Sequence, residues 1–244
     1  MRSAARLKLR VASVAMLAFV LVALGACTTA LTGLTPPDAP LQQRPAHPQA
    51  RLLIVGDSTA VGTGASSAAA SLAGRIAAAH PRLQIDNRGR NGARFANLMA
   101  QFVAGERHDA VLILAGGNDV IRRTPPERLA RDIDATLAAA TAQAPLVIVM
   151  PAGNVGNAPL LQLTPLAGGL TQRSRELQAL VRDAAERHGA VHVDLFREHA
   201  DDPFVQQRDL TAADGLHPSD AGYRLWHDEL MAQTALGSVL APAR

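Results

Sequence analysis

Five short runs of apolar and β-branched residues recur along the chain, and this feature restricts its fold most. Segments with helical spacing separate the runs, so strand and helix alternate throughout. Strands buried on both faces appear as continuous apolar runs, and their alternation with helices predicts a parallel sheet covered on both sides. The predicted strands are residues 51–55, 83–87, 110–114, 146–150 and 191–194. We therefore expect an α/β fold, a single doubly wound domain in which helices cover both faces of a five-stranded parallel sheet.

Two of the predicted helices have recognisable ends. One begins at Thr124, because Thr124 and Glu127 have the spacing of a capping box and Pro125 suits the first helical position. The residues on its apolar face are Leu129, Ile133 and Leu137. The other helix ends at Gly189. Its stripe consists of Leu177, Val181, Ala184 and His188. In the last helix, Tyr223 and Trp226 are expected to pack in the core.

The N-terminal segment has the pattern of an export signal. Four basic residues up to Arg10 precede an apolar run over 11–24, which is shorter than the roughly 20 residues that span a bilayer. The sequence Leu24-Gly25-Ala26-Cys27 resembles the lipobox of bacterial lipoproteins, whose cysteine is lipidated. The resemblance implies a lipoprotein signal peptide at 1–26 and a membrane anchor at Cys27. An ordinary cleaved signal with an incidental cysteine, or an uncleaved anchor, is the alternative.

A proline-rich linker is predicted over residues 27–50, because proline recurs there and prevents a helix. The lipobox resemblance implies that the exported protein lies in a bacterial cell envelope, on the periplasmic side. Thr28, rather than Asp, follows the cysteine, and this favours the outer membrane.

The formal net charge of +3 comes from the basic residues of the predicted signal peptide. Without these four basic residues, the chain holds 20 Lys and Arg against 21 Asp and Glu. This balance and the 3% aromatic content do not favour binding to nucleic acid. The single cysteine excludes an intramolecular disulfide and any multi-cysteine metal site. We expect no metal and no other cofactor.

Polar and glycine-rich blocks follow four of the predicted strands. They are Gly56-Asp57-Ser58-Thr59, Asn87-Arg88-Gly89-Arg90-Asn91-Gly92, Gly116-Gly117-Asn118-Asp119 and, in a long loop, Asp214-Gly215-Leu216-His217-Pro218. Each block alone is ordinary turn chemistry. Because ligands of such sheets bind beyond the carboxyl ends of the strands, the four blocks are expected to form one site.

Together and in this order, the blocks resemble those of the SGNH hydrolases, also called the GDSL esterase and lipase family. The resemblance covers the chain from Arg51 to about Leu236 and implies a flavodoxin-like SGNH hydrolase domain at 51–244. It identifies Ser58 as the family's serine and His217 as its histidine, with Asp214 three residues earlier. Thr59 stands where the family name has leucine.

The residue types support this chemistry. A serine hydroxyl is a weak nucleophile until a base takes its proton, and a histidine oriented by a carboxylate is suited to that task. We therefore expect Ser58, His217 and Asp214 to be catalytic.

The ester oxygen needs hydrogen-bond donors fixed before the reaction. Those expected are the backbone N–H groups of Ser58 and Gly92 and the side-chain amide of Asn118. Gly89 competes with Gly92, although the spacing Asn-x-Gly-x-x-Gly favours the latter. Asp57 and Asp119 are expected to support the site by bonding to backbone N–H groups of its loops.

The expected activity is the serine-dependent hydrolysis of short-chain acyl, aryl or lysophospholipid-like esters, small molecules or lipids, through an acyl-enzyme. Two alternatives are an O-acetyl esterase acting on envelope polysaccharide and a non-catalytic lipoprotein that binds an acylated envelope component. The segment 151–169 is either a lid or acyl-chain wall or a plainly packed loop. A metallophosphoesterase would need an Asp-x-His pair, and a mononucleotide binder a phosphate loop; neither motif is present.

Overall fold

The computed structural model describes residues 39–162 and 164–240. The predicted signal peptide, Cys27, the first part of the linker and Leu163 therefore lie outside the described residues. Within the described ranges, no helix combines the length and the apolar character needed to cross a membrane.

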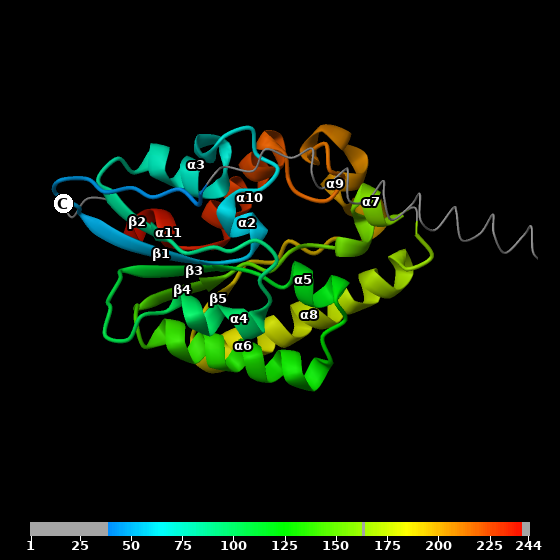
Figure 1. The fold of residues 1–244 in the computed structure, drawn as a ribbon, viewed down its shortest axis with the longest axis horizontal. Helices are drawn as coiled ribbons and strands as arrows, with labels where there is room; N and C mark the ends of the chain where they lie inside the picture. Colours follow the sequence, from blue (N-terminus) through cyan, green and yellow to red (C-terminus); the bar gives the residue numbers. More distant parts are fainter. Residues whose placement is uncertain (1–38, 163, 241–244) are drawn as a thin grey trace, which may run out of the picture. The chain divides into compact units, whose positions relative to one another are not determined.

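Five parallel strands form one sheet in the order β2-β1-β3-β4-β5 (Figure 1). The strands are β1 (Ala50–Gly56), β2 (Leu83–Asn87), β3 (Ala110–Leu114), β4 (Leu146–Val149) and β5 (Val191–His192). The order reverses direction beside β1, which places a topological switch point between β1 and β3. This arrangement confirms the predicted fold class.

The last strand is shorter than the predicted 191–194. Its ladder ends soon after His192, although the N–H of Val193 still donates to the carbonyl oxygen of Val149 at 3.0 Å. The next N–H, that of Asp194, points away from β4 and donates to the side chain of Gln233 at 2.9 Å. The Asp194 N–H, on the outer side of this edge strand, is therefore satisfied by a side chain and not by a further strand.

Three helices cover one face of the sheet, namely α3 (Leu72–Ala79), α10 (Asp220–Gln233) and α11 (Leu236–Val239) (Figure 1). Leu52 and Ile54 of β1 point into this layer and are fully buried. Tyr223 and Trp226 lie in the same core with their rings edge to face, 6.0 Å apart. Their predicted use in core packing is confirmed.

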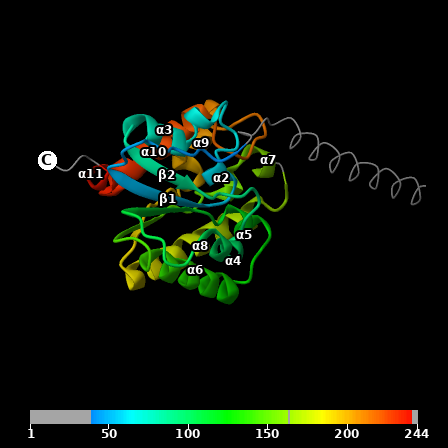
Figure 2. The ribbon, with the colours of Figure 1, turned by 60° about the vertical axis from the view of Figure 1, so that its left-hand side comes forward.

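The opposite face is covered by α4 (Phe95–Leu98), α6 (Pro126–Thr141) and α8 (Ala167–His188) (Figure 2). The alternate residues of β1, Leu53 and Val55, point into this second core. The predicted apolar faces of α6 and α8 are buried there, and α8 ends at Gly189 with φ +65°. His188 is the exception to the predicted stripe, because its ring bonds to Asp134 of α6 at 3.1 Å instead of entering the core.

The capping box predicted at Thr124 is wrong. Helix α6 begins at Pro126 with Pro125 at the N-cap position. The hydroxyl of Thr124 donates to the Asp119 carboxylate at 2.8 Å. Thr124 therefore lies one residue before the N-cap, and its hydroxyl bonds to the loop of Asp119 and not to the helix end.

Short helices occupy the connections at the carboxyl ends of the strands and elsewhere. The α-helical ones are α2 (Ser58–Val61), α5 (Gly117–Ile121), α7 (Pro159–Gln162) and α9 (Pro203–Gln206). The 3-10 turns are Ala68–Ala70, Met99–Gln101, Val155–Asn157, His199–Asp201 and Arg208–Leu210.

The C-terminal part of the predicted linker packs on the domain. Gln43 forms an antiparallel bridge with Ile85 of β2, with N···O distances of 3.2 and 3.0 Å. Arg44 pairs with Asp86 on the same strand. This segment covers the outer edge of β2, which would otherwise present unpaired backbone groups. The structure therefore differs here from the linker predicted up to residue 50.

We expect a chain that begins at Ala50 to be less stable than one that begins at Ala39. The shorter chain loses both Gln43–Ile85 backbone bonds and the Arg44–Asp86 pair, which together contribute about 1 to 3 kcal/mol. Urea unfolding of the two chains measures the difference. Equal unfolding midpoints would show that the segment adds nothing to the domain.

Candidate active site

Ser58 is the first residue of α2 and lies directly beyond the end of β1. The buried carboxylate of Asp57 caps this helix, accepting from the backbone N–H of Thr59 at 2.9 Å. The hydroxyl of Thr59 donates to the same oxygen at 2.8 Å, a contact that leucine could not make. The two bonds between Thr59 and Asp57 therefore hold the turn that carries Ser58.

Ser58, His217 and Asp214 form a continuous hydrogen-bonded relay. Nε2 of His217 lies 2.8 Å from Oγ of Ser58, and Nδ1 lies 2.5 Å from Oδ2 of Asp214. The other carboxylate oxygen of Asp214 accepts from the backbone N–H groups of Leu216 and His217 at 3.0 and 3.1 Å. One carboxylate thus holds both the ring and the backbone of the histidine. The three residues predicted to be catalytic are brought together.

The loop that carries His217 sits against the segment after α2. Gly64 has φ +93°, and a Cβ there would come within 2.8 Å of the His217 Cβ and 2.5 Å of the Pro218 carbonyl oxygen. Only glycine permits this conformation together with such a close approach. The buried hydroxyl of Tyr223 donates to the carbonyl oxygen of Thr63 at 2.8 Å and ties α10 to the same segment.

The pKa values of the carboxylates near Ser58 and His217 are shifted in different directions. Burial raises the pKa of Asp57 and of Asp119 above the ordinary value, although their hydrogen bonds act in the opposite direction. Burial also opposes ionisation of Asp214, but the bond from the His217 ring and two backbone N–H groups outweigh it. The pKa of Asp214 therefore lies below its ordinary value. Asp214 is ionised at neutral pH and can stabilise a positive charge on His217.

The three predicted oxyanion donors have no hydrogen-bond acceptor within the part of the chain that the structure describes. The N–H of Ser58 is at the first position of a helix, where no intrahelical acceptor exists. In the described part of the chain, no hydrogen bond uses the Gly92 N–H or the Asn118 amide. The competing Gly89 N–H, in contrast, donates to the Asn87 side chain at 3.0 Å. This favours Gly92, whose φ of +74° also suits glycine.

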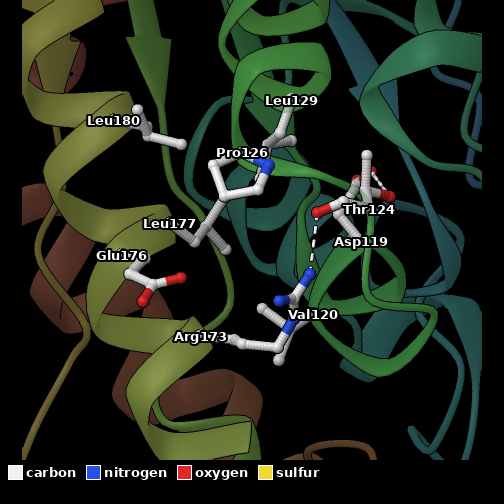
Figure 3. A pocket seen from close by; sticks show the side chains of 9 residues that line it. All are labelled: Asp119, Val120, Thr124, Pro126, Leu129, Arg173, Glu176, Leu177 and Leu180. Carbon is white, nitrogen blue, oxygen red and sulfur yellow. Dashed lines mark hydrogen bonds between the residues drawn. The ribbon is translucent and has the colours of Figure 1, made fainter.

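Asp119 joins the blocks that follow β2 and β3. Its carboxylate accepts from the backbone N–H of Phe95 at 3.0 Å and from the hydroxyl of Thr124 at 2.8 Å. Behind it lies a small pocket between α5, α6 and α8, where Arg173 donates to the Thr124 carbonyl oxygen (Figure 3). None of the relay residues lines this pocket, so it belongs to the packing around Asp119.

Two supporting contacts were not anticipated from the sequence. The buried side chain of Gln101 accepts from the Gly56 N–H at 2.7 Å and donates to the Gly56 carbonyl oxygen at 2.9 Å. The amide of Asn87 donates to the carbonyl oxygen of Ala60 at 2.7 Å, which links β2 to α2. Both contacts join residues that are distant in sequence, and no local motif predicts them.

The predicted loop 151–169 contains a 3-10 turn, helix α7 and the first turn of α8. The N–H of Leu160 in α7 donates to the carbonyl oxygen of Gly215 at 2.9 Å, so α7 lies beside the loop of His217. Leu160 and Leu161 are half-buried, and Leu166 is 48% exposed. Among the residues that the structure describes, no cluster of side chains could hold a metal ion.

The Asp214→Asn substitution should lower the free energy of unfolding by about 1 to 2 kcal/mol at about pH 7 and by less at about pH 3. Because the folded pKa of Asp214 is depressed, the carboxylate contributes stability above its unfolded pKa. That contribution is lost as the pH falls through the folded pKa. Urea titrations of both proteins at the two pH values test this. An equal loss at both would contradict the depressed pKa.

Several solved structures share this fold. An α/β hydrolase enzyme from the metagenome of Lake Arreo, Spain, has 24% identity and a TM-score of 0.60, and the match covers 80% of this chain and 98% of that one. An acetylxylan esterase from Geobacillus stearothermophilus has 20% identity and a TM-score of 0.55, over 77% and 94% of the two chains. A lipolytic G-D-S-L protein from Veillonella parvula has 16% identity and a TM-score of 0.61, over 76% and 98%.

A comparison with curated proteins gave no match. The model of the GDSL-like lipase/acylhydrolase family matches residues 54–225. This range contains all four blocks, from the turn of Ser58 to the loop of His217. The chain therefore belongs to the GDSL-like lipase/acylhydrolase family and is a carboxylic ester hydrolase.

Proposed function

We propose that the protein hydrolyses carboxylic esters through an acyl-enzyme on Ser58. The observation that carries this proposal is the relay from Asp214 through His217 to Oγ of Ser58, with distances of 2.5 and 2.8 Å. At these distances the base, His217, is already hydrogen-bonded to the nucleophile, Ser58.

In the first half of the reaction, Oγ of Ser58 bonds to the ester carbonyl carbon while its proton passes to Nε2 of His217. The ionised carboxylate of Asp214 stabilises the imidazolium that forms. The carbon–oxygen bond to the alcohol then breaks, and the alcohol leaves with the proton from His217. The acyl group remains on Ser58.

In the second half, His217 takes a proton from water as the water oxygen bonds to the acyl carbon. The bond between this carbon and Oγ of Ser58 breaks, and the serine regains its proton. In both halves the carbonyl oxygen becomes an oxyanion, to which Ser58, Gly92 and Asn118 would donate. Asp57 and Asp119 hold the turns that present these donors.

Catalytic variants of the Geobacillus esterase give this assignment further support. Their names specify a serine, an aspartate and a histidine, with the last two three residues apart. Asp214 and His217 have the same separation. At this level of identity the likeness concerns the fold, so the assignment here rests on the relay geometry.

The proposed substrates are short-chain acyl, aryl or lysophospholipid-like esters. The partly exposed leucines on and after α7, beside the loop of His217, would form a wall for the acyl group. An O-acetyl ester of an envelope polysaccharide is the competing substrate. Sugars favour aromatic platforms, but Phe95, Tyr223 and Trp226 are buried in the two cores. The half-buried Phe204 packs on Trp226.

The cellular location is also a proposal. Lipidation of Cys27 would hold the domain in the bacterial envelope, on the periplasmic side of the outer membrane. In a bacterial host, an alkyne-bearing palmitate should label the wild-type protein and leave Cys27→Ala unlabelled. Equal labelling of the two would contradict an anchor at this cysteine.

The nucleophile is tested with p-nitrophenyl esters from acetyl to palmitoyl and with an acetylated polysaccharide. Ser58→Ala should abolish hydrolysis. Asn118→Ala should retain the fold and lower kcat about a hundredfold or more, because one oxyanion donor contributes about 2.7 to 4 kcal/mol. A fluorophosphonate probe should label the wild-type protein on Ser58.

Thr141→Ala on α6 serves as the matched control, since its hydroxyl bonds only within its own helix. A folded wild-type protein that cleaves no ester and resists the probe would overturn the proposal. The non-catalytic lipoprotein would then be the better account. The chain-length profile of an active protein distinguishes a short acyl site from a lysophospholipid-like one.

A further inference from the structure

Arg122 lies one helical turn after Asn118 and ends α5. Its backbone N–H donates to the carbonyl oxygen of Asn118 at 3.0 Å. Residues four apart on a helix share a face. The Arg122 side chain therefore leaves α5 on the side that carries the proposed oxyanion donor.

The Arg122 guanidinium lies beside Gly92, the second proposed donor. A Cβ on Gly92 would meet Nη2 of Arg122 at 3.3 Å, and among the described residues no other atom beyond the chain neighbours of Gly92 lies within 4 Å of it. Two loops that follow different strands thus bring this positive charge to the rim of the proposed oxyanion hole.

The charge of Arg122 is not neutralised within the described part of the chain. Some arginines there have carboxylate partners, as in Arg88–Glu106 at 2.6 Å and Arg187–Asp134 at 2.9 Å, and others have none. Over residues 39–162 and 164–240, no carboxylate lies within 4.0 Å of the Arg122 guanidinium, and no hydrogen bond uses it. Its donors are therefore available to a ligand.

The surroundings are basic as well. Arg90 and Arg94 belong to the same loop as Gly92, which contains no acidic residue, and Arg123 follows Arg122 directly. Arg123 has φ +54°, the only positive φ of a non-glycine residue in the described ranges. This backbone conformation costs free energy, and it directly follows Arg122 at the end of α5.

We propose that Arg122 binds an anionic group of the substrate, so that the enzyme prefers esters with a carboxylate or phosphate a few bonds from the scissile carbonyl. This rests on the proposed function, because the subsite is defined by the oxyanion donors Gly92 and Asn118. A planar guanidinium with free N–H donors matches the geometry of a carboxylate or a phosphate. The anion can belong to the acyl part or to the alcohol part.

The test compares matched neutral and anionic esters. On the acyl side, the pair is mono-p-nitrophenyl glutarate and its methyl ester. On the alcohol side, it is 4-acetoxybenzoate and methyl 4-acetoxybenzoate. The proteins are wild type, Arg122→Gln, Arg122→Lys and Arg128→Gln, the last removing an equal charge from an exposed pair with Asp132 on α6.

Arg122→Gln should lower kcat/KM for the anionic ester of at least one pair about five- to thirtyfold and leave the neutral esters within about twofold. Arg122→Lys should retain part of the preference, and Arg128→Gln all of it. Because the guanidinium is exposed, added salt should weaken the wild-type preference for the anionic ester.

Equal losses on neutral and anionic esters would overturn the inference, since Arg122 would then support the oxyanion or its loop. Unchanged rates on all four esters would overturn it too. In both cases the wild-type protein still cleaves neutral esters, so the proposed function stands. A wild-type protein that cleaves none of them and resists the fluorophosphonate probe would overturn both.

Discussion

The hydrogen bond between Nε2 of His217 and Oγ of Ser58 joins residues 159 positions apart, and the site depends on it. A parallel sheet makes this contact achievable, because all strands end at the same edge and their loops converge there. Two further restraints bring the contact to 2.8 Å. Asp214 fixes both the ring and the backbone of the histidine, and Gly64 lets the loop of His217 approach closely.

The carboxylates near the site differ in environment and therefore in the direction of their pKa shifts. Asp57 and Asp119 are buried, and burial outweighs the hydrogen bonds that their carboxylates accept, so their pKa values rise. Asp214 receives a bond from the imidazole and two from the backbone, and its pKa falls. The carboxylate that faces the base is thus the one held ionised. Beside the proposed oxyanion donors, Arg122 adds an exposed positive charge, which connects the proposed reaction to a choice of substrate.

The fold and the convergence of the blocks could be predicted because they depend on local patterns, namely apolar runs and the polar residues that end them. Contacts between distant residues could not. Gln101 pairs with the backbone of Gly56 across 45 positions, and Gln43 bridges to Ile85 on an edge strand. Both depend on tertiary register. The helix start at Thr124 was also missed, because the hydroxyl of Thr124 bonds to Asp119 and the helix begins at Pro126. The roles of the site residues and the lipid anchor remain predictions.

A crystal structure of the protein with a phosphonate ester bound covalently would test the central claim most directly. The phosphorus should be bonded to Oγ of Ser58, with Nε2 of His217 within hydrogen-bonding distance of the serine or leaving-group oxygen. One phosphonate oxygen should accept from the N–H groups of Ser58 and Gly92 and from the Asn118 amide at about 2.7 to 3.1 Å. A phosphonate attached to another residue, or an oxygen that points away from these three donors, would contradict the account.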